Sequence, residues 1–437
     1  MASENHLRRV LTPFMIWGIG VGYVISGNYF GWNLGLAEGG SVGLAIATAV
    51  VILMYITFTY SYAELACAIP QAGGVFDYTS RALGPNVGFI AGMAQNLEFI
   101  LAPPAIALGI GSYMHLYLPA IPALYFSVGA YFLFTAVNTL GIKTAALVEL
   151  MVTLIAVAGL ILFAALTIPH ASVDSFVRNG LPHGVSGIFA AVPFAIWFFL
   201  GIEGVANLAE EAKDPRHTMS RGFLATLFTL IAVCFLTFFG SVGQAGWEAV
   251  VYGTDGTTSD APLPMAIQLI PDSSARNVQI LIALGLFGLV ASFNGLMLAA
   301  GRSLYEFGRV TRIIRWMGTL SERHKTPRNA LLLNLVIGLI ALFSGKTSEV
   351  ITLSVCGALV VYISSMISLI VLRRTEPNLD RPFRVPLYPV FPLAALVIAI
   401  GCLVALVVFN FMLCAVFAGI VVLAFGIFKV RSSSLTP

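Results

Sequence analysis

Charged residues are scarce in this sequence. Asp, Glu, Lys and Arg make up 10% of the 437 residues, whereas hydrophobic residues make up 58%. Soluble domains usually contain about a quarter of charged residues, so the composition excludes an ordinary soluble protein. The mean hydropathy of +0.93 agrees. We expect the chain to lie in a lipid bilayer, and its net charge of +3 to reflect topology and contact with anionic lipid rather than nucleic acid.

Residues typical of disulfides, metal sites and catalytic centres are also few. The five cysteines fall in or beside apolar stretches without a C-x-x-C pair, so we interpret them as packing residues. The six histidines lie in tails, loops or helix ends, without metal-binding spacing. No nucleophile–base pair is recognisable. The sequence therefore predicts no enzyme, no metal site and no cofactor.

Long apolar runs are what the sequence contains instead. A membrane-spanning helix needs about 20 apolar residues. Division of the chain at clusters of charge, Pro and Gly gives twelve such runs, two of them separated only by residues 344–347 and two only by Asn410. The predicted spans are 13–37, 41–66, 86–116, 122–139, 144–168, 187–209, 218–244, 276–305, 329–344, 347–371, 388–408 and 410–429.

The distribution of basic residues predicts the orientation of these spans. Lys and Arg collect on the cytoplasmic side of membrane proteins. With the N-terminus inside, all 23 Lys and Arg residues except Arg178, Arg276 and Lys346 fall in cytoplasmic segments. We therefore predict a multi-pass protein of the plasma membrane, the inner membrane of a bacterium, with cytoplasmic tails at 1–12 and 430–437. The first run is too long for a removed signal peptide and lacks a cleavage site, so we expect it to remain.

Two of the apolar runs contain residues that loosen a helix. The first has the sequence VISGN at 24–28, and the second has FFLGI at 198–202, followed by Glu203. A helix interrupted inside lipid leaves backbone N–H and C=O groups that protein, water or a ligand must satisfy. Broken helices around a site near the middle of the bilayer are typical of secondary transporters. The sequence therefore predicts a transporter.

Two acidic residues are expected at membrane depth. Counting at about 1.5 Å per residue, Glu98 lies roughly 18 Å along the third run, with Gln95 on its face. Burying Glu98 or Glu203 costs about 3 kcal/mol on insertion scales unless a partner or proton compensates, and an ammonium substrate would do so. The alternatives are that Glu98 hydrogen-bonds a neighbouring helix or stays protonated, and that Glu203 is a fixed partner for unwound backbone N–H groups.

Polar residues elsewhere in the apolar runs are weaker candidates. Ser292, Phe293 and Asn294 interrupt the run 281–300, so we expect them to face the other helices rather than lipid. Asn294 either binds a substrate hydroxyl or joins two helices. Glu149 lies closer to the cytoplasm, where a vestibule or structural salt-bridge role is favoured over substrate contact.

Three cytoplasmic stretches carry further polar residues. Gly73 and Gly74 allow a sharp turn after the second run, and a short helix under the transport path is expected next. The acidic stretch 210–216 and the basic stretch 301–328 follow the sixth and eighth runs. We expect the three stretches to pair in a gate or hinge, the alternative being plain solvated loops.

The order of several motifs resembles the amino acid–polyamine–organocation superfamily. These are Ser26-Gly27 in the first break, YAEL followed by Pro70 and AGG at 72–74, W-x-x-x-G-x-E at 197–203, EE-x-K-D-P-R at 210–216 and AGRSLY at 300–305. The resemblance covers roughly residues 10–430. It implies a leucine-transporter-type fold with two inverted repeats of five helices, 13–168 and 187–371, whose helices 1 and 6 are broken. Helices 11 and 12, at 388–429, lie outside the repeats.

Within this superfamily, the runs 23–33 and 98–105 look most like the ethanolamine permease group. Amino-acid members usually read G-S-G at the first break, where N–H groups hold a carboxylate. Here Ile25 replaces the first Gly, and its branched side chain should crowd that site. By the same resemblance, Trp197 fits an aromatic over the substrate, which would favour an ammonium group, although a Trp in an apolar core is ordinary. Some proton-coupled relatives carry a Lys midway along the fifth helix. In this sequence Ala156 aligns with that position, so the Lys used for proton coupling is absent.

The sequence therefore predicts uptake of ethanolamine or a similar small amine by alternating access. Proton coupling through Glu98, Glu203 or Glu149 is left open beside uniport and exchange, and so is a monomer or a homodimer. An amino-acid permease or exchanger is the nearer alternative, and a non-transporting membrane sensor is the remote one. The candidate substrate-binding residues are Ile25, Ser26, Gly27, Asn28, Gln95, Glu98, Trp197, Phe199, Gly201, Glu203, Phe293 and Asn294.

Overall fold

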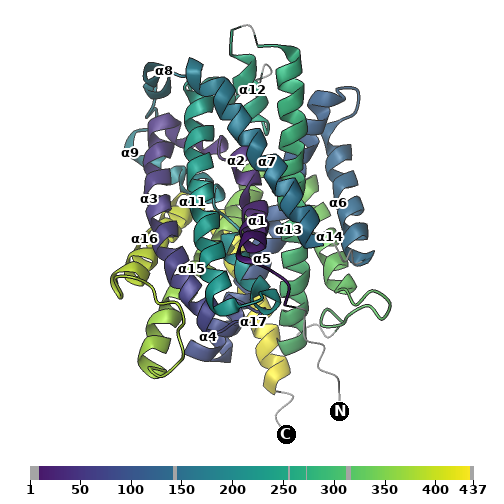
Figure 1. Cartoon of the computed structure of the whole chain (residues 1–437), viewed down its shortest axis with the longest axis vertical. Coiled ribbons are helices and arrows are strands. Elements are labelled where there is room, and N and C mark those ends of the chain that lie inside the picture. The colour runs from purple at the N-terminus through teal and green to yellow at the C-terminus, as the bar shows by residue number, and fades with distance from the viewer. Residues whose placement is uncertain (1–8, 141–144, 254–255, 272, 312–315, 434–437) are drawn as a thin grey trace.

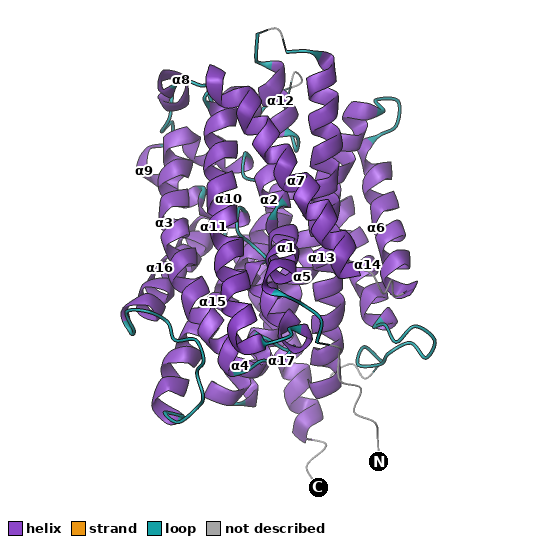
Figure 2. Cartoon of the chain, viewed as in Figure 1, coloured by secondary structure: helices purple, strands orange, loops and turns teal. Residues whose placement is uncertain are grey.

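The structure, a computed structural model, describes residues 9–140, 145–253, 256–271, 273–311 and 316–433. Over these residues the regular elements are helices, which run mostly along one direction in a single bundle (Figures 1 and 2). Their bounds are α1 Pro13–Val24, α2 Ser26–Tyr29, α3 Leu34–Ala68, α4 Val75–Leu83, α5 Pro85–Tyr117, α6 Ala123–Leu140, α7 Ala145–Thr167, η1 Ile168–His170, α8 Val173–Val177, α9 Gly184–Ala190, α10 Val192–Trp197, η2 Ile202–Glu211, α11 Pro215–Val242, η3 Glu248–Val250, α12 Pro262–Gln268, α13 Ala275–Thr311, α14 Arg328–Phe343, α15 Thr347–Thr375, α16 Val390–Phe409 and α17 Phe411–Ser433.

The long helices coincide with the predicted runs. Among the described residues, 10 helical segments are long and apolar enough to cross a membrane, and α1 and α14 are two shorter apolar helices. Together these segments occupy the positions of the twelve runs. The all-helical membrane fold is therefore confirmed. That each of the twelve crosses the bilayer, and that they form two inverted repeats, stay predictions.

Helix α3 differs from the prediction at its start. It joins the end of the first predicted run to the whole of the second in one segment of 35 residues. Gly40 interrupts the helix with φ 67° and ψ −176°, a conformation open to glycine because it has no Cβ. A Cβ at Gly40 would lie 2.4 Å from Cδ of Pro182. The boundary between the two runs is therefore a kink at Gly40 rather than a loop.

Both predicted breaks are present. After α1 and α2, Phe30 is extended and α3 starts only at Leu34. In the second break, α10 ends at Trp197 and the 3₁₀ helix η2 starts at Ile202, after Gly201 with φ 100°. The most apolar stretch of residues 192–211, which contain this second break, is completely buried. The interrupted segment therefore lies inside the bundle, shielded from lipid by its neighbours.

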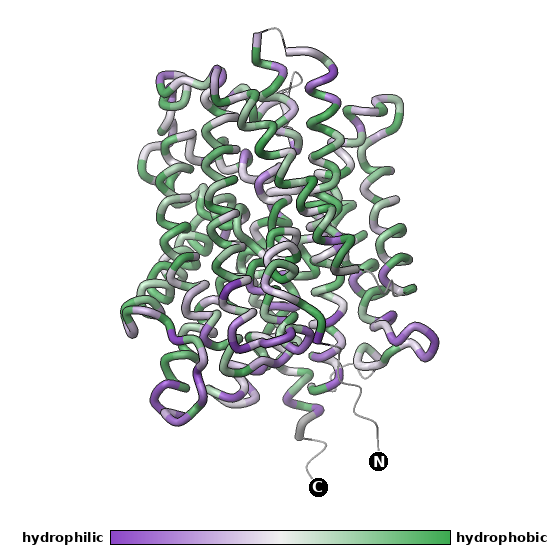
Figure 3. Tube along the Cα trace, in the orientation of Figure 1, coloured by the Kyte–Doolittle hydropathy of each residue, from purple (hydrophilic) through white to green (hydrophobic). Residues whose placement is uncertain are grey.

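Polar residues gather at one end of the bundle (Figure 3). Helix α4 and the end of α17 lie there (Figure 1). We call this the basic end and define it by Arg81, Arg302, Arg373 and Arg381. Helices α3 and η2 run toward it, and α5 starts from it. Four of the basic residues that predict the orientation lie outside the described residues: Arg8, Lys143, Arg312 and Arg315.

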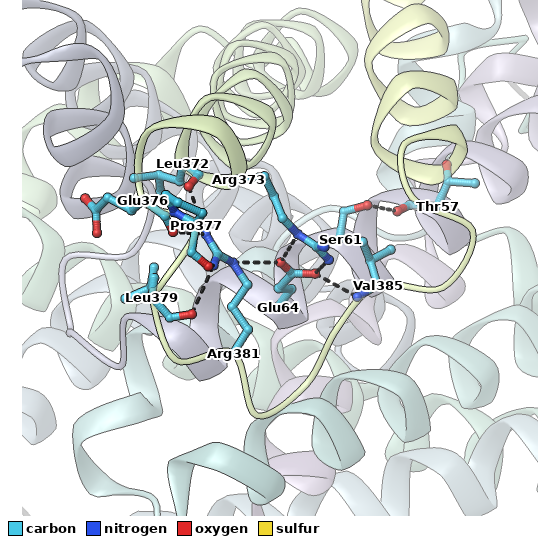
Figure 4. Close-up of polar contacts among 10 residues, drawn as sticks. All are labelled: Thr57, Ser61, Glu64, Leu372, Arg373, Glu376, Pro377, Leu379, Arg381 and Val385. Carbon is cyan, nitrogen blue, oxygen red and sulfur yellow. Dashed lines mark hydrogen bonds and ion pairs between the residues drawn. The ribbon is translucent and has the colours of Figure 1, made fainter.

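A fully paired carboxylate ties three segments together at the basic end (Figure 4). Glu64 of α3 is 0% exposed and accepts hydrogen bonds from Arg373 of α15 at 2.7 and 2.6 Å. Nε of Arg381 lies 3.3 Å from Glu64, and the Val385 N–H donates to it at 2.7 Å. Arg381 also donates to backbone carbonyls at the end of α15. The cluster holds α3, α15 and the segment before α16 in one place.

Candidate functional site

The first break is bridged by a side chain from α13. The Ser292 hydroxyl donates to the Gly22 carbonyl at 2.6 Å and accepts from the Ser26 amide at 2.9 Å. In a continuous helix these two backbone groups would bond to each other. Ser292 thus satisfies the pair that the break separates, which allows an interrupted helix away from water. The prediction that Ser292 faces the bundle is confirmed.

The second break lies directly against the first. A Cβ on Gly27 would come within 2.3 Å of the Trp197 carbonyl oxygen, so this approach requires glycine. The Trp197 indole N–H donates to the Phe30 carbonyl at 3.0 Å. At the far side of the second break, the left-handed Gly201 turns the chain toward Glu203. The two broken segments therefore meet, as a shared site requires.

Glu98 of α5 and Glu203 of η2 form a buried carboxyl pair beside the second break. Both residues are 0% exposed and both lie against α15, Glu98 beside Ser354 and Gly357, and Glu203 beside Tyr362. Among the described residues, no donor bonds either oxygen of Glu98 or Oε1 of Glu203. The Tyr362 hydroxyl donates to Oε2 of Glu203 at 3.0 Å, and it lies 2.8 Å from the Tyr55 hydroxyl. Since two buried carboxylates near each other repel, a shared proton or a bound cation would stabilise the pair.

Other predicted residues surround the two breaks. Ile25 is buried between α1 and α2. The Phe199 ring lies 5.0 Å from the ring of Tyr55, whose hydroxyl group is hydrogen-bonded to that of Tyr362. Asn28 is 0% exposed, and neither polar atom of its side chain has a partner among the described residues. Asn28 is therefore a second group at the breaks whose hydrogen-bonding capacity is unused.

Three predicted residues lie in a different contact region. Phe293 packs edge-to-face on Tyr131 of α6, with ring centroids 4.9 Å apart. Asn294 accepts a hydrogen bond from Asn138 at 3.1 Å and donates one to Oε2 of Glu149 at 3.4 Å. These contacts match the alternative in which Asn294 joins helices. A role of Phe293 and Asn294 at the substrate stays a prediction.

Glu149 nevertheless touches the first break. A Cβ on Gly22 would lie 2.8 Å from Oε1 of Glu149 and 2.6 Å from the Thr153 hydroxyl oxygen. Within the described part of the chain, neither of these oxygens has a hydrogen-bond partner. The Glu149 carboxyl thus lies beside Gly22, the residue whose carbonyl accepts the Ser292 hydrogen bond.

The three polar stretches contact one another at the basic end, as predicted, and their role as a gate or hinge stays a prediction. Nη1 of Arg302 in α13 lies 2.9 Å from Oε1 of Glu211 in η2. The Ala72 N–H, in the turn before α4, donates to Glu210 at 3.0 Å. The predicted short helix after this turn is α4. The second broken helix is therefore tied at its end to both α13 and the turn before α4.

Sequence reasoning did not select three residues that the structure brings to the site. Tyr55 and Tyr362 lie in long apolar runs where nothing distinguishes them from the other tyrosines, and only the fold brings their hydroxyl groups together. Asn207 follows Glu203 by four residues, and its amide bonds Gln95 at 3.4 Å. Because Asn207 is a polar residue close to a break in an apolar run, it could have been selected from the sequence as a site residue.

The arrangement is suited to binding one positive charge. Two buried carboxyl groups with unused oxygens could accept hydrogen bonds from an ammonium group or share a proton. In the described part of the chain, no group of three or more His, Cys, Asp or Glu is placed to hold a metal ion.

Comparison with known proteins identifies the family. A family model described as amino acid permease matches residues 11–428. The chain belongs to this family. The resemblance to the amino acid–polyamine–organocation superfamily, which contains these permeases, is thereby confirmed.

Individual relatives of this permease cover most of its length. It is 27% identical over 407 residues to an uncharacterized transporter of Rhizobium meliloti (strain 1021), with 91% of this chain and 85% of that protein aligned. It is 24% identical over 416 residues to the branched-chain amino acid permease BcaP of Bacillus subtilis (strain 168), covering 90% and 86%. A third relative is the low-affinity putrescine importer PlaP of Escherichia coli (strain K12), 29% identical over 250 residues and 54% of each chain. The chain is therefore a multi-pass membrane transporter of small molecules, not an enzyme.

Proposed function

We propose that this permease takes up a small organic amine, ethanolamine or a similar molecule, by alternating access. The observation that carries the proposal is the buried pair of Glu98 and Glu203, in which neither oxygen of Glu98 accepts a hydrogen bond from the described residues. A buried carboxylate in a membrane protein costs about 3 kcal/mol on insertion scales. The ammonium group of an amine would offset that cost and supply the missing donors.

The rest of the site supports an amine that carries a second polar group. Tyr362 holds Glu203 in place through one oxygen and leaves the other for the ligand. The unused amide of Asn28 is suited to a hydroxyl or a second amine. Putrescine, named for one relative, carries two ammonium groups and is therefore a natural comparison ligand.

An amino acid is the second candidate substrate, because one relative is a branched-chain amino acid permease. A carboxylate would have to bind the N–H groups at the first break, where the buried Ile25 stands in place of a glycine. It would also lie near two acidic residues. These two features favour the amine over the amino acid.

The proposal includes the topology and the mode of coupling. Twelve spans with both termini in the cytoplasm would place the basic end inside the cell, in the plasma membrane. The bundle built from helices 1, 2, 6 and 7, two from each of the repeats 13–168 and 187–371, would then rock and switch access to the carboxyl pair. A proton carried by Glu98, Glu203 or Glu149 would couple uptake to the proton gradient.

Uptake into proteoliposomes tests the proposal. Labelled ethanolamine is supplied with and without an inward proton gradient, and unlabelled ethanolamine, putrescine, choline, leucine, alanine and arginine compete. Block by the small amines but not by leucine, alanine or arginine supports the amine permease, and acceleration by the gradient supports proton coupling. Absence of ethanolamine flux with clear leucine or alanine exchange would assign the protein to the amino-acid alternative.

A further inference from the structure

A second polar layer lies between the carboxyl pair and the basic end. Gln95 precedes Glu98 by three residues in α5, about 4.5 Å along the helix axis. Asn207 follows Glu203 by four residues in η2, about 8 Å at the rise of a 3₁₀ helix. Tyr62 lies near the end of α3 that points the same way. We call Tyr62, Gln95 and Asn207 the inner polar layer.

The inner polar layer has unused hydrogen-bonding capacity. Its three residues are 0–4% exposed. Nε2 of Gln95 donates to Oδ1 of Asn207 at 3.4 Å, but Oε1 of Gln95 and Nδ2 of Asn207 have no partner among the described residues. The Tyr62 hydroxyl has no hydrogen bond of normal geometry there either. Because a buried polar group without a partner is costly, such a cluster suggests a ligand in another state of the protein.

A glycine turn covers this layer from the basic end. Gly74 has φ 56°, and a Cβ on it would lie 3.0 Å from Oδ1 of Asn207, 3.4 Å from the Tyr62 hydroxyl and 3.6 Å from Nε2 of Gln95. The backbone of Gly74 therefore rests on all three polar tips. A residue with a Cβ at position 74 would strain the backbone and would come too close to the Asn207 side chain.

The turn is joined to the start of α4 through its backbone, because the Gly74 carbonyl accepts from the Asp77 and Tyr78 N–H groups at 3.1 Å. We call residues 72–74 the Gly74 turn. The Ala72 N–H donates to Oε1 of Glu210 at 3.0 Å, and the Gly73 N–H donates to Oδ2 of Asp77 at 3.0 Å. Both bonds involve exposed or half-buried groups, which solvent competes for readily. Among the described residues, the hydrogen bond from the turn to another helix is the exposed one from Ala72 to Glu210, so the turn can move together with the start of α4.

We propose that the inner polar layer is a release-side binding site for the transported solute and that the Gly74 turn is the gate that covers it. The layer binds an ammonium or hydroxyl group after that group leaves Glu98 and Glu203. Its side chains are neutral, so they hold a cation more weakly than the carboxyl pair does and let it continue to the basic end. The proposal rests on the proposed transport function and adds a second site to it.

Hydrogen exchange tests the gate without any substrate. Gly74→Ala is compared with Gly84→Ala, whose φ of 87° imposes similar backbone strain but whose Cβ would meet nothing within 4 Å. We expect backbone amides of residues 203–211 to exchange about tenfold faster in Gly74→Ala and unchanged in Gly84→Ala. A thermal melt confirms that both variants fold. Equal exchange in the two variants overturns the gate.

Transport kinetics measured from each side of the membrane test the site. Asn207→Leu and Gln95→Leu are compared with two buried controls, Asn334→Leu in α14 and Asn96→Leu, the neighbour of Gln95 that bonds its own helix at Gly92. The probe is whichever of labelled ethanolamine, putrescine or leucine the wild type carries, in vesicles of both orientations. Loss of one hydrogen bond should raise KM at the basic end about tenfold, with KM at the other end within about twofold. The controls should change neither value.

The outcomes separate this proposal from the proposed function. Equal KM changes at both ends, or none, mean that the layer binds water only or is structural, and the release site is then wrong. A wild type that carries none of the three probes contradicts the proposed function. In that case the exchange experiment still decides whether the Gly74 turn is a gate.

Discussion

Two buried acidic sites in this permease differ in the hydrogen-bond and ion-pair partners of their carboxyl groups. Glu64 is 0% exposed and is paired with Arg373, Arg381 and the Val385 amide (Figure 4). Glu98 is equally buried, but no protein donor among the described residues bonds it. Its partner Glu203 adds a second acidic group rather than a basic one.

The difference separates a carboxylate with a structural role from one that we propose binds a ligand. Ion pairs inside proteins persist when each charge has its partners in place, and Glu64 meets that condition from three segments of the chain. Glu98 does not, so its neutralisation must come from a proton or from the solute. The charges at the basic end therefore hold segments of the fold together, and we propose that those at the breaks serve transport.

Removing the charge of Glu64 should have the largest effect. Glu64→Gln leaves the guanidinium groups of Arg373 and Arg381 without their carboxylate, and breaking such a buried pair costs about 3–5 kcal/mol. We expect a large fall in the melting temperature of the purified protein. The double variant Glu64→Leu with Arg373→Leu should recover part of the loss. A single variant as stable as the wild type would show that Glu64 is not a structural partner.

Removing the charge of Glu98 should act on transport instead. Glu98→Gln keeps the shape but loses a charged hydrogen-bond acceptor, and uptake of labelled ethanolamine should fall about 100-fold, or about 3 kcal/mol. Stability should stay the same or rise, because a buried carboxyl group without a partner is removed. Glu38→Gln, an exposed acidic residue in an apolar run, is the control and should transport normally. An unchanged apparent affinity in Glu98→Gln removes this residue from the site.

How far the sequence predicted these sites depends on the distance of the partners along the chain. The breaks were predictable because glycine and polar residues inside an apolar run are local signals, and Glu203 directly follows one break. The bridging role of Ser292 and the tyrosine pair were not predictable, because their partners lie hundreds of residues away. Glu64 was visible only as part of a motif, since Arg373 is 309 positions further along. Helix spans depend on composition and were therefore placed well, apart from the Gly40 kink.

A partly paired carboxyl group at the basic end should make stability depend on pH. Burial raises the pKa of Asp77 to about 6, with Glu306 and Glu210 adding to the effect, while the Gly73 N–H and Arg309 oppose it. The folded protein then binds a proton between about pH 4 and 6 that the unfolded chain releases, so this contribution to stability falls as pH rises.

Asp77→Asn tests this dependence. The variant should be more stable than the wild type at pH 8, by about 2 kcal/mol, and its melting temperature should vary less between pH 4 and 7. Burial also raises the pKa of Asp260 to about 6, so part of the slope should remain. A wild-type slope retained in full by Asp77→Asn would show that this carboxyl does not titrate in that range.

The exposed ion pair of Arg81 and Glu376 should matter least. Their side chains are 42% and 33% exposed, and Nη2 of Arg81 lies 2.6 Å from Oε2 of Glu376. Exposed pairs contribute about 0–1 kcal/mol because solvent screens them. Arg81→Gln should therefore change the melting temperature little, and high salt should remove the difference. A loss comparable to that of Glu64→Gln would contradict the contrast between exposed and buried pairs at this end.

Direct binding of labelled ethanolamine to the purified wild type and to Glu98→Gln tests the central claim, that the unpartnered carboxyl pair receives a cation. We predict saturable binding to the wild type that putrescine displaces and leucine does not, and binding about 100-fold weaker in Glu98→Gln. Equal binding by both proteins, or displacement of the label by leucine but not by putrescine, would contradict it.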